Sequence, residues 1–427
     1  KDMTIRLGRR QFLMGSSALA AAAAAGISPA FAQSALRLIF WGGQARADRT
    51  YAVTDLYEAA GNPGLEAEFL SWNDYWPKLA TQTAGGTAPD IIQMDYRYIV
   101  EYATRNAIAP LDDVIGDLGE FDADQLEGGK VDGQLYGISL GANSVATLAN
   151  KKAIEEIGET VPDNSWTYAD LERLGEAFKS AGNGMVAFSD GSGTEPMLDN
   201  WLRQRGLALY TADNKLGFTA DDAVEWFQMW NGFREKGYIV DAETQALDTG
   251  TPESSMVATK KAAMMPSNSN QLVIHQSIND DELTITSYPR IAPGVGGGHY
   301  RKPSMFFSVG GSSADPAAAA AFINFFVTNP EAGAILGVER GIPCNSAVRE
   351  AITPTLDEQS QIALNFVANL GDLVGALPPS PPAAAGEIDL NLLRVISQEV
   401  AFGARSAEDG GKAFVEEATA ILARANA

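Results

Sequence analysis

Residues Ala88 to Arg97, which read A-P-D-I-I-Q-M-D-Y-R, decide the fold of this chain. A proline stop precedes the short apolar run from Ile91 to Met94, and a polar cluster follows it. This order predicts a buried parallel strand that ends at a binding crevice, because ligands of open α/β sheets bind at the carboxyl edge of the strands. The same residues also fit a plain core strand followed by a solvated turn, with Asp90 accepting from local backbone amides.

Length, charge and cysteine content limit the class of protein. A chain of 427 residues is too long for one ordinary core, so we expect two domains. Its net charge of −23 argues against nucleic acid and anionic membrane surfaces as partners. The negative charge slightly favours a cationic ligand, and it does not exclude an anionic one. With two histidines and the single Cys344, neither a disulfide framework nor a His/Cys metal cage can form, so we expect no metal and no cofactor.

Residues 1–32 resemble a twin-arginine export signal. The basic start contains Arg9 and Arg10, an alanine-rich stretch follows, and Ala30-Phe31-Ala32 precedes the expected cleavage site. The apolar part is too short for a membrane span, and no cysteine stands at the junction to carry a lipid. We therefore expect a soluble protein in the periplasm.

Aromatic residues surround the predicted ends of the first strands. Leu36 to Trp41 predicts strand one, and the glycines after it would let the backbone approach a ligand closely. Trp72 precedes a predicted helix and is a candidate platform for a sugar face, whereas the helical spacing of Trp76 favours the core. Trp226 and Trp230 are four residues apart on one helical face and are also assigned to the core.

Several further segments carry turn, hinge or helix signals. Residues 99–109 predict one helix, and Asp315 with Pro316 predicts the start of another. Gly141 to Asn143 separates two apolar runs and predicts a strand that bends between lobes, with a plain hairpin as the alternative. Ala262 to Met265 predicts a short strand, followed by a polar segment in which a helix begins.

Taken together, these segments resemble extracellular solute-binding proteins of sugar ABC importers, the family that includes maltose-binding protein. The resemblance covers nearly the whole chain after the signal, and its elements occur in the family's order: Trp41-Gly42-Gly43, Pro89-Asp90-Ile91-Ile92, Leu135-Tyr136-Gly137-Ile138, Asn150-Lys151, Ser165-Trp166-Thr167, Ala262-Ala263-Met264, Phe306 to Pro316, Asn329-Pro330-Glu331-Ala332 and Gly341-Ile342-Pro343.

The resemblance implies a type II periplasmic-binding-protein fold. Two α/β lobes would be joined by a hinge and close on a ligand in the cleft between them. It places residues 33–142 and 308–345 in the first lobe, and residues 143–307 and 346–427 in the second. It also implies a monomer that presents a small carbohydrate to the membrane permease subunits of an ABC importer.

The resemblance also implies a set of ligand-binding residues at the ends of strands and at the hinge. They are Trp41, Gly42, Gln44, Trp72, Asp95, Tyr96, Asn143, Asp190, Ser192, Ser267, Asn268, Asn270 and Arg340. The maltose-type protein has a tryptophan at the position aligned with Met94 and another in the segment aligned with residues 267–270, so we do not expect long malto-oligosaccharides as ligands.

Two other functions remain open. A secreted carbohydrate-active enzyme would need two opposed carboxylates, for which Asp95 and Asp190 are candidates. A polyamine or metal carrier would fit the acidic charge, although the scarcity of histidine argues against transition metals. Arg46 and Arg340 could read an acidic group on a ligand, or else be taken up by salt bridges.

Overall fold

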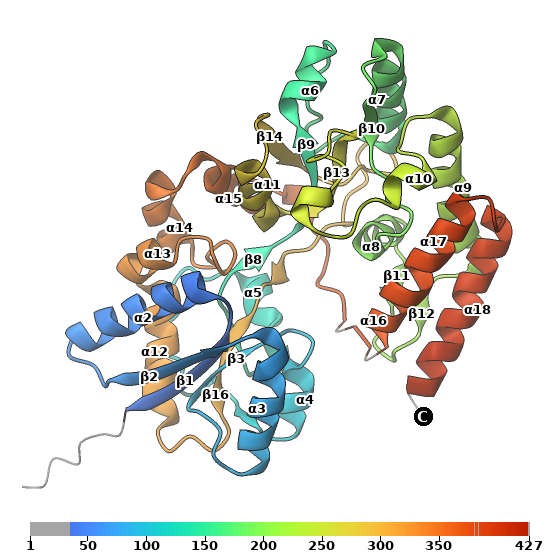
Figure 1. Ribbon diagram of the computed structural model, residues 1–427. Coiled ribbons are helices and arrows are strands. Elements are labelled where there is room, and N and C mark those ends of the chain that lie inside the picture. Colours follow the sequence, from blue (N-terminus) through green and yellow to red (C-terminus); the bar gives the residue numbers. More distant parts are fainter. Residues whose placement is uncertain (1–34, 380, 383, 426–427) are drawn as a thin grey trace, which may run out of the picture.

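The computed structural model describes residues 35–379, 381–382 and 384–425. The predicted export signal, residues 1–32, lies outside this part of the chain. The described residues form two α/β lobes, each with its own sheet and hydrophobic core (Figure 1). The predicted fold class is confirmed.

The sheet of the first lobe is built around the strand predicted from the deciding stretch. Strand β3 (Ile91–Met94) has the predicted bounds and is buried at every position. It pairs in parallel with β1 (Leu36–Trp41) and antiparallel with β16 (Phe306–Gly310). The order along the sheet is β2-β1-β3-β16-β4, with β2 (Leu65–Leu70) and β4 (Ile108–Ala109) at its ends, and a sixth strand, β7 (Ile138–Ser139), also pairs with β16. Asp90 is structural, since its carboxylate accepts from the Arg37 amide and the Ser313 hydroxyl.

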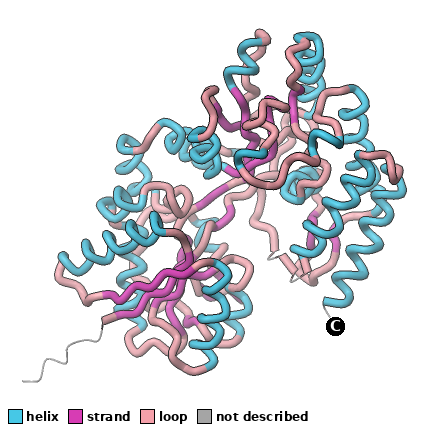
Figure 2. The backbone as a smooth tube through the Cα atoms, viewed as in Figure 1, coloured by secondary structure: helices cyan, strands magenta, loops and turns pink. Residues whose placement is uncertain are grey.

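Helices cover the faces of the first sheet (Figure 2). The Asp315 carboxylate accepts from the Ala318 amide at the start of α12, with Pro316 at the first helical position as predicted. The predicted helix over residues 99–109 is too long, because Asn106 turns the chain with a φ of 54° and the segment continues as β4. The helices are α2 (Gln44–Ala59), α3 (Trp72–Ala84), α4 (Ile99–Thr104), α5 (Ala123–Glu127), α12 (Pro316–Thr328), α13 (Pro330–Leu336) and α14 (Ser346–Ile352).

The second lobe holds a four-stranded sheet with the order β10-β13-β9-β14. The strands are β10 (Val186–Phe188), β13 (Ala262–Asn268), β9 (Val145–Asn150) and β14 (Leu283–Thr286). Strand β13 is longer than predicted. It continues through Asn268 because residues 264–268 pair with residues 145–149 of β9.

Helices of the second lobe pack on this sheet and on one another. Trp226 and Trp230 of α9 are fully buried, as predicted. The Thr167 side chain and Asp170 form the capping box that begins α7. The helices are α6 (Lys151–Glu156), α7 (Tyr168–Ala181), α8 (Glu195–Gln204), α9 (Ala220–Lys236), α10 (Ala242–Gln245), α11 (Leu272–Ser277), α15 (Glu358–Ala368), α16 (Ala385–Glu387), α17 (Arg394–Ala401) and α18 (Ala407–Ala425).

Short paired segments connect the two lobes. Strand β8 (Ala142–Asn143) pairs antiparallel with β15 (Lys302–Pro303), and Ala142 exchanges two backbone hydrogen bonds with Ile342. Gly141 is required at this crossing, because a Cβ there would lie 2.4 Å from the Arg340 carbonyl oxygen. These paired segments, which we call the crossing, lie next to both sheets. The residue numbers at which each lobe begins and ends stay a prediction.

No helix within the described residues is long and apolar enough to cross a membrane.

Candidate functional site

A hollow between the lobes begins where β3 ends. Asp95, Tyr96 and Arg97 line it on the side of the first lobe. Tyr300 and Lys302 from the crossing segment line it too, together with Pro378, Pro379 and Pro381 from the loop before α16. The space measures about 50 Å³. The Tyr96 hydroxyl donates to the Pro378 carbonyl oxygen at 2.7 Å, and the Asp95 carboxylate accepts from the Arg97 amide at 2.8 Å.

A second space of about 100 Å³ continues past Tyr300 and the same three prolines into the second lobe. We call the two spaces together the cleft hollow. Glu195, Asp199 and Arg203 line this part from α8. Their i, i+4 spacing places all three on one face of that helix. The cleft hollow therefore brings the end of β3 opposite a charged helix face of the other lobe.

The two acids of α8 lie in surroundings that oppose ionisation. Burial, aided by the charges of Asp389 and Asp199, raises the pKa of Glu195 to about 7. Burial likewise raises the pKa of Asp199 to about 6, against the opposing charge of Arg203. Near neutral pH these carboxyls can donate as well as accept hydrogen bonds. This suits hydroxyl groups, which also do both.

The Arg203 guanidinium holds the walls of the cleft hollow in place. It donates to the carbonyl oxygens of Gly298 and Ala376, at 3.1 and 2.6 Å. It also lies over the Tyr300 ring, 5.0 Å from the centroid. These three contacts tie α8 to the crossing segment and to the proline loop.

Trp72 is the exposed member of an aromatic cluster at the end of β1. Its side chain is 40% exposed, and its ring meets the Trp41 ring edge to face at 5.1 Å. Trp41 is only 8% exposed, and its buried ring packs against the Trp72 ring. Gly42 is the next residue after Trp41. A side chain at this position would collide with Arg46, because a Cβ there would lie 2.5 Å from Arg46 Cδ. Gln44 is exposed and donates to Asp48. Trp72 thus has an exposed ring in contact with Trp41, and the ligand contacts predicted for these residues stay predictions.

A larger groove adjoins the same crossing and is called the hinge groove. It measures about 840 Å³ and is lined from both lobes by 17 residues, among them the predicted Asn143 and Asn270. The Asn143 amide oxygen is buried without a hydrogen-bond partner among the described residues. Ser267 is buried, whereas Asn268 is exposed. Ligand contacts for these four residues remain predictions.

Arg340 makes its contacts within the first lobe, and its predicted role in ligand binding stays a prediction. Its side chain is 3% exposed and donates to the Gln93 amide oxygen and to the Thr50 hydroxyl, at 3.3 and 2.9 Å. Its guanidinium also lies 5.5 Å from the Phe40 ring centroid. Arg46 is likewise taken up, by Glu339 at 2.8 Å. Both arginines connect helices and strands within the first lobe.

Asp190 and Ser192 also have structural partners. The Asp190 carboxylate pairs with Arg234 at 2.5 Å, and both side chains are almost completely buried. Ser192 is 1% exposed and its hydroxyl donates to Asp190. The polar atoms of these side chains are thus bonded within the second lobe, and their predicted ligand contacts stay predictions.

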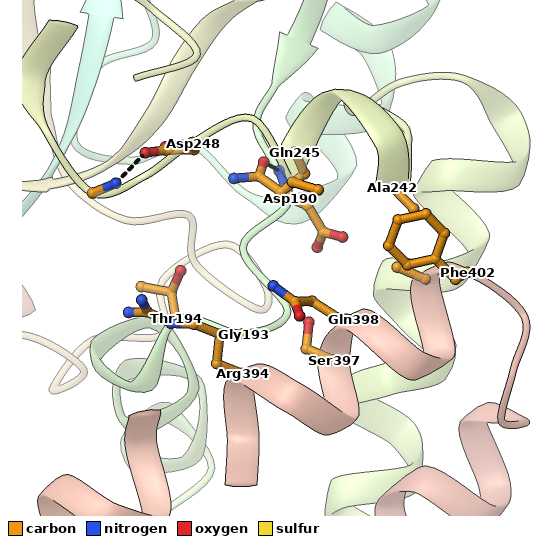
Figure 3. Close-up of a pocket in the computed structure, with 13 residues that line it drawn as sticks. Asp190, Gly193, Thr194, Ala242, Gln245, Asp248, Arg394, Ser397, Gln398 and Phe402 are labelled. Atoms are coloured by element: carbon orange, nitrogen blue, oxygen red, sulfur yellow. Dashed lines mark hydrogen bonds between the residues drawn. The ribbon is translucent and has the colours of Figure 1, made fainter. Parts of the chain in front are cut away.

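Asp190 lines a separate pocket of about 190 Å³, the second-lobe pocket (Figure 3). Its other walls come from α10, the start of α8 and α17, including Thr194, Gln245, Arg394 and Phe402. All of these belong to the second lobe, so Asp190 does not oppose Asp95 of the cleft hollow across one pocket.

The sequence reading missed the residues that α8 and the crossing segment contribute. Glu195, Asp199, Tyr300 and Lys302 line the cleft hollow, yet none had been proposed. The sequence does carry a signal for Glu195 and Asp199. A glycine-rich loop leads into a predicted helix, and two acids four residues apart would lie on one face of that helix. Tyr300 and Lys302 carry no local signal, since only the crossing of the strands places them there.

The described residues contain no group of three or more histidine, cysteine, aspartate or glutamate side chains arranged to hold a metal ion.

Comparison with known proteins identifies the family. The model of the bacterial extracellular solute-binding proteins matches residues 52–362. The chain belongs to this family.

Solved structures of similar fold cover almost the whole chain. A family 1 extracellular solute-binding protein from Alicyclobacillus acidocaldarius is 30% identical, with a TM-score of 0.81, over 91% of this chain and 98% of that one. A periplasmic oligogalacturonide-binding protein from Yersinia enterocolitica is 21% identical, with a TM-score of 0.76, over 92% of this chain and all of that one. At that identity, the second likeness concerns the fold alone.

A curated binding protein from Brucella abortus is 29% identical over 111 residues. This match spans 25% of the present chain and 27% of that relative's length.

Proposed function

We propose that the protein captures a sugar or sugar derivative in the periplasm and delivers it to the permease of an ABC importer. The observation that carries this proposal is the cleft hollow, where Asp95 and Tyr96 of one lobe lie across from Glu195 and Asp199 of the other. The similar structures include an oligogalacturonide-binding protein, which supports a carbohydrate as the ligand class.

The groups around the cleft hollow match the surface of a sugar. Carboxyls exchange paired hydrogen bonds with neighbouring hydroxyls, and aromatic rings such as those of Tyr96 and Tyr300 cover the C–H faces. Each charge-assisted hydrogen bond contributes about 1.5 to 3 kcal/mol. A few of them reach the roughly 8 kcal/mol of a micromolar complex.

Binding in this proposal closes the lobes around the β8–β15 crossing. Closure brings Asp95 and Glu195 onto the same ligand and removes water from their hydrogen bonds. The mature chain acts as a monomer and performs no chemistry on the ligand.

A thermal-shift panel of mono- and disaccharides beside spermidine tests the proposal, because a ligand that binds the folded state raises the melting temperature. We expect a saccharide to give a shift that Asp95→Ala abolishes. A shift with spermidine alone would contradict the proposal. Release of free sugar from an aryl glycoside would point instead to an enzyme.

A further inference from the structure

Four cationic side chains of this acidic protein have no partner within the described part of the chain. Among the lysines and arginines of residues 35–425, these four have no hydrogen bond from the side chain and no ion pair within 4 Å: Arg97, Lys261, Lys302 and Arg394. The others are bonded, often to carboxylates, as Arg46 is to Glu339. The chain has 54 acidic and 31 basic residues, so it contains more carboxylates than basic side chains to pair with them.

Two of the four lie together at the candidate site. Arg97 and Lys302 line the same part of the cleft hollow, although one follows β3 and the other belongs to β15. Lys261, by contrast, lines none of the hollows described above. The Arg97 backbone is fixed, because its amide donates to Asp95 at 2.8 Å, while its guanidinium remains exposed. The fold therefore holds two unpaired positive charges at one end of the cleft hollow.

This pair has the chemistry of a carboxylate site. A guanidinium presents parallel N–H groups that match the two oxygens of a carboxylate, and an ammonium adds a point charge. We propose that the ligand is an acidic saccharide, whose carboxylate binds Arg97 and Lys302 while its hydroxyl groups bind Glu195 and Asp199. This inference rests on the proposed function and names the chemical class of the ligand.

The acids at the other end of the cleft hollow favour hydroxyls over an amine. Their raised pKa values leave them partly protonated near neutral pH, which weakens their attraction for a cation. Arg97 also lies near enough to lower the pKa of Glu195, so its positive field extends through the cleft hollow. An amino sugar would place its charge against Arg97 and Lys302 if bound in the same orientation.

Titration calorimetry on the full chain can separate these ligand classes. The probes are galacturonic acid, glucuronic acid and digalacturonic acid, each beside its methyl ester and its neutral parent sugar, with galactosamine as the cationic probe. We expect one acid to bind at least tenfold more tightly than its ester, and its affinity to fall between 20 and 300 mM NaCl because ionic contacts are screened.

A double variant and a control variant assign the effect to residues. Arg97→Gln with Lys302→Gln should bring the acid and its ester to equal affinity while the ester still binds, whereas Lys261→Gln should behave as the parent protein. Equal or tighter binding of an ester, a neutral sugar or galactosamine would overturn this inference and leave the proposed function standing. If no saccharide of any charge binds, the proposed function fails with it.

Discussion

The Tyr96 hydroxyl donates to the Pro378 carbonyl oxygen at 2.7 Å, across 282 positions of sequence. This bond ties the end of the central strand β3 to the loop that precedes α16. Both residues line the cleft hollow, so the contact fixes one of its walls. The consequences of this arrangement can be measured at several places.

Tyr96→Phe should loosen the proline loop. The variant removes a hydrogen bond of about 1 kcal/mol but keeps the ring. Backbone amides of residues 373–377 should exchange with deuterium several-fold faster, as hydrogen-exchange mass spectrometry would detect. Tyr136→Phe is the control, because the Tyr136 hydroxyl bonds within its own turn to Gln134. Unchanged exchange in the Tyr96 variant would mean that the bond does not hold the loop.

Trp72→Ala should weaken saccharide binding about tenfold while changing stability little. The side chain is 40% exposed, so its ring is available to a ligand. Phe402→Ala serves as the matched control, since Phe402 is 54% exposed and lines the second-lobe pocket instead. Calorimetry with the bound sugar compares the two. Equal affinities for the Trp72 variant and the parent protein would remove the platform from the account.

Arg234→Ala should destabilise the second lobe strongly. The variant leaves the Asp190 carboxylate buried without its partner, which costs about 3 to 5 kcal/mol. Lys412→Ala breaks an exposed pair with Glu408, which solvent screens, and should leave the free energy of unfolding almost unchanged. Urea denaturation measures both free energies. A loss below 1 kcal/mol in the Arg234 variant would argue against the structural role assigned to Asp190.

Glu195 should make the ligand-free protein less stable as the pH rises from 4.5 to 7. The pKa of this carboxyl is about 7 in the folded chain, above its ordinary value of 4.5. Within that window the folded state holds a proton that the unfolded chain has lost, so the group's contribution to stability falls as the proton leaves. Glu195→Gln should therefore raise the melting temperature at pH 8 more than at pH 5.

The control for this pH profile is Glu66→Gln, at an exposed glutamate of β2. It should shift the melting temperature equally at both pH values. A parallel profile for the Glu195 variant and the parent protein would contradict the raised pKa.

Local sequence signals were sufficient for the central strand of the first lobe and for the start of α12. The apolar run Ile91 to Met94 predicted β3 at its observed bounds, because a strand buried on both faces needs an uninterrupted apolar stretch. Asp315 with Pro316 predicted the start of α12 for an equally local reason. The end of α4 was not predicted. It depends on a single residue, Asn106, that adopts a left-handed backbone conformation, and the pattern of apolar residues does not reveal such a turn.

The site was harder to predict, since it depends on contacts distant in sequence. Asp190 and Arg340 have the residue types expected at a ligand site, but Arg234 and Gln93 occupy them in the folded chain. Nothing near either residue in the sequence reveals these partners. Tyr300 and Lys302 reach the cleft hollow only because β15 pairs with β8 at the crossing.

Native mass spectrometry of the gently purified protein tests the central claim most directly. A ligand retained in the cleft hollow should appear as an added mass equal to a saccharide, and Asp95→Ala should lose it. An added mass equal to a polyamine or a peptide, or a saccharide retained equally by the Asp95 variant, would contradict the account.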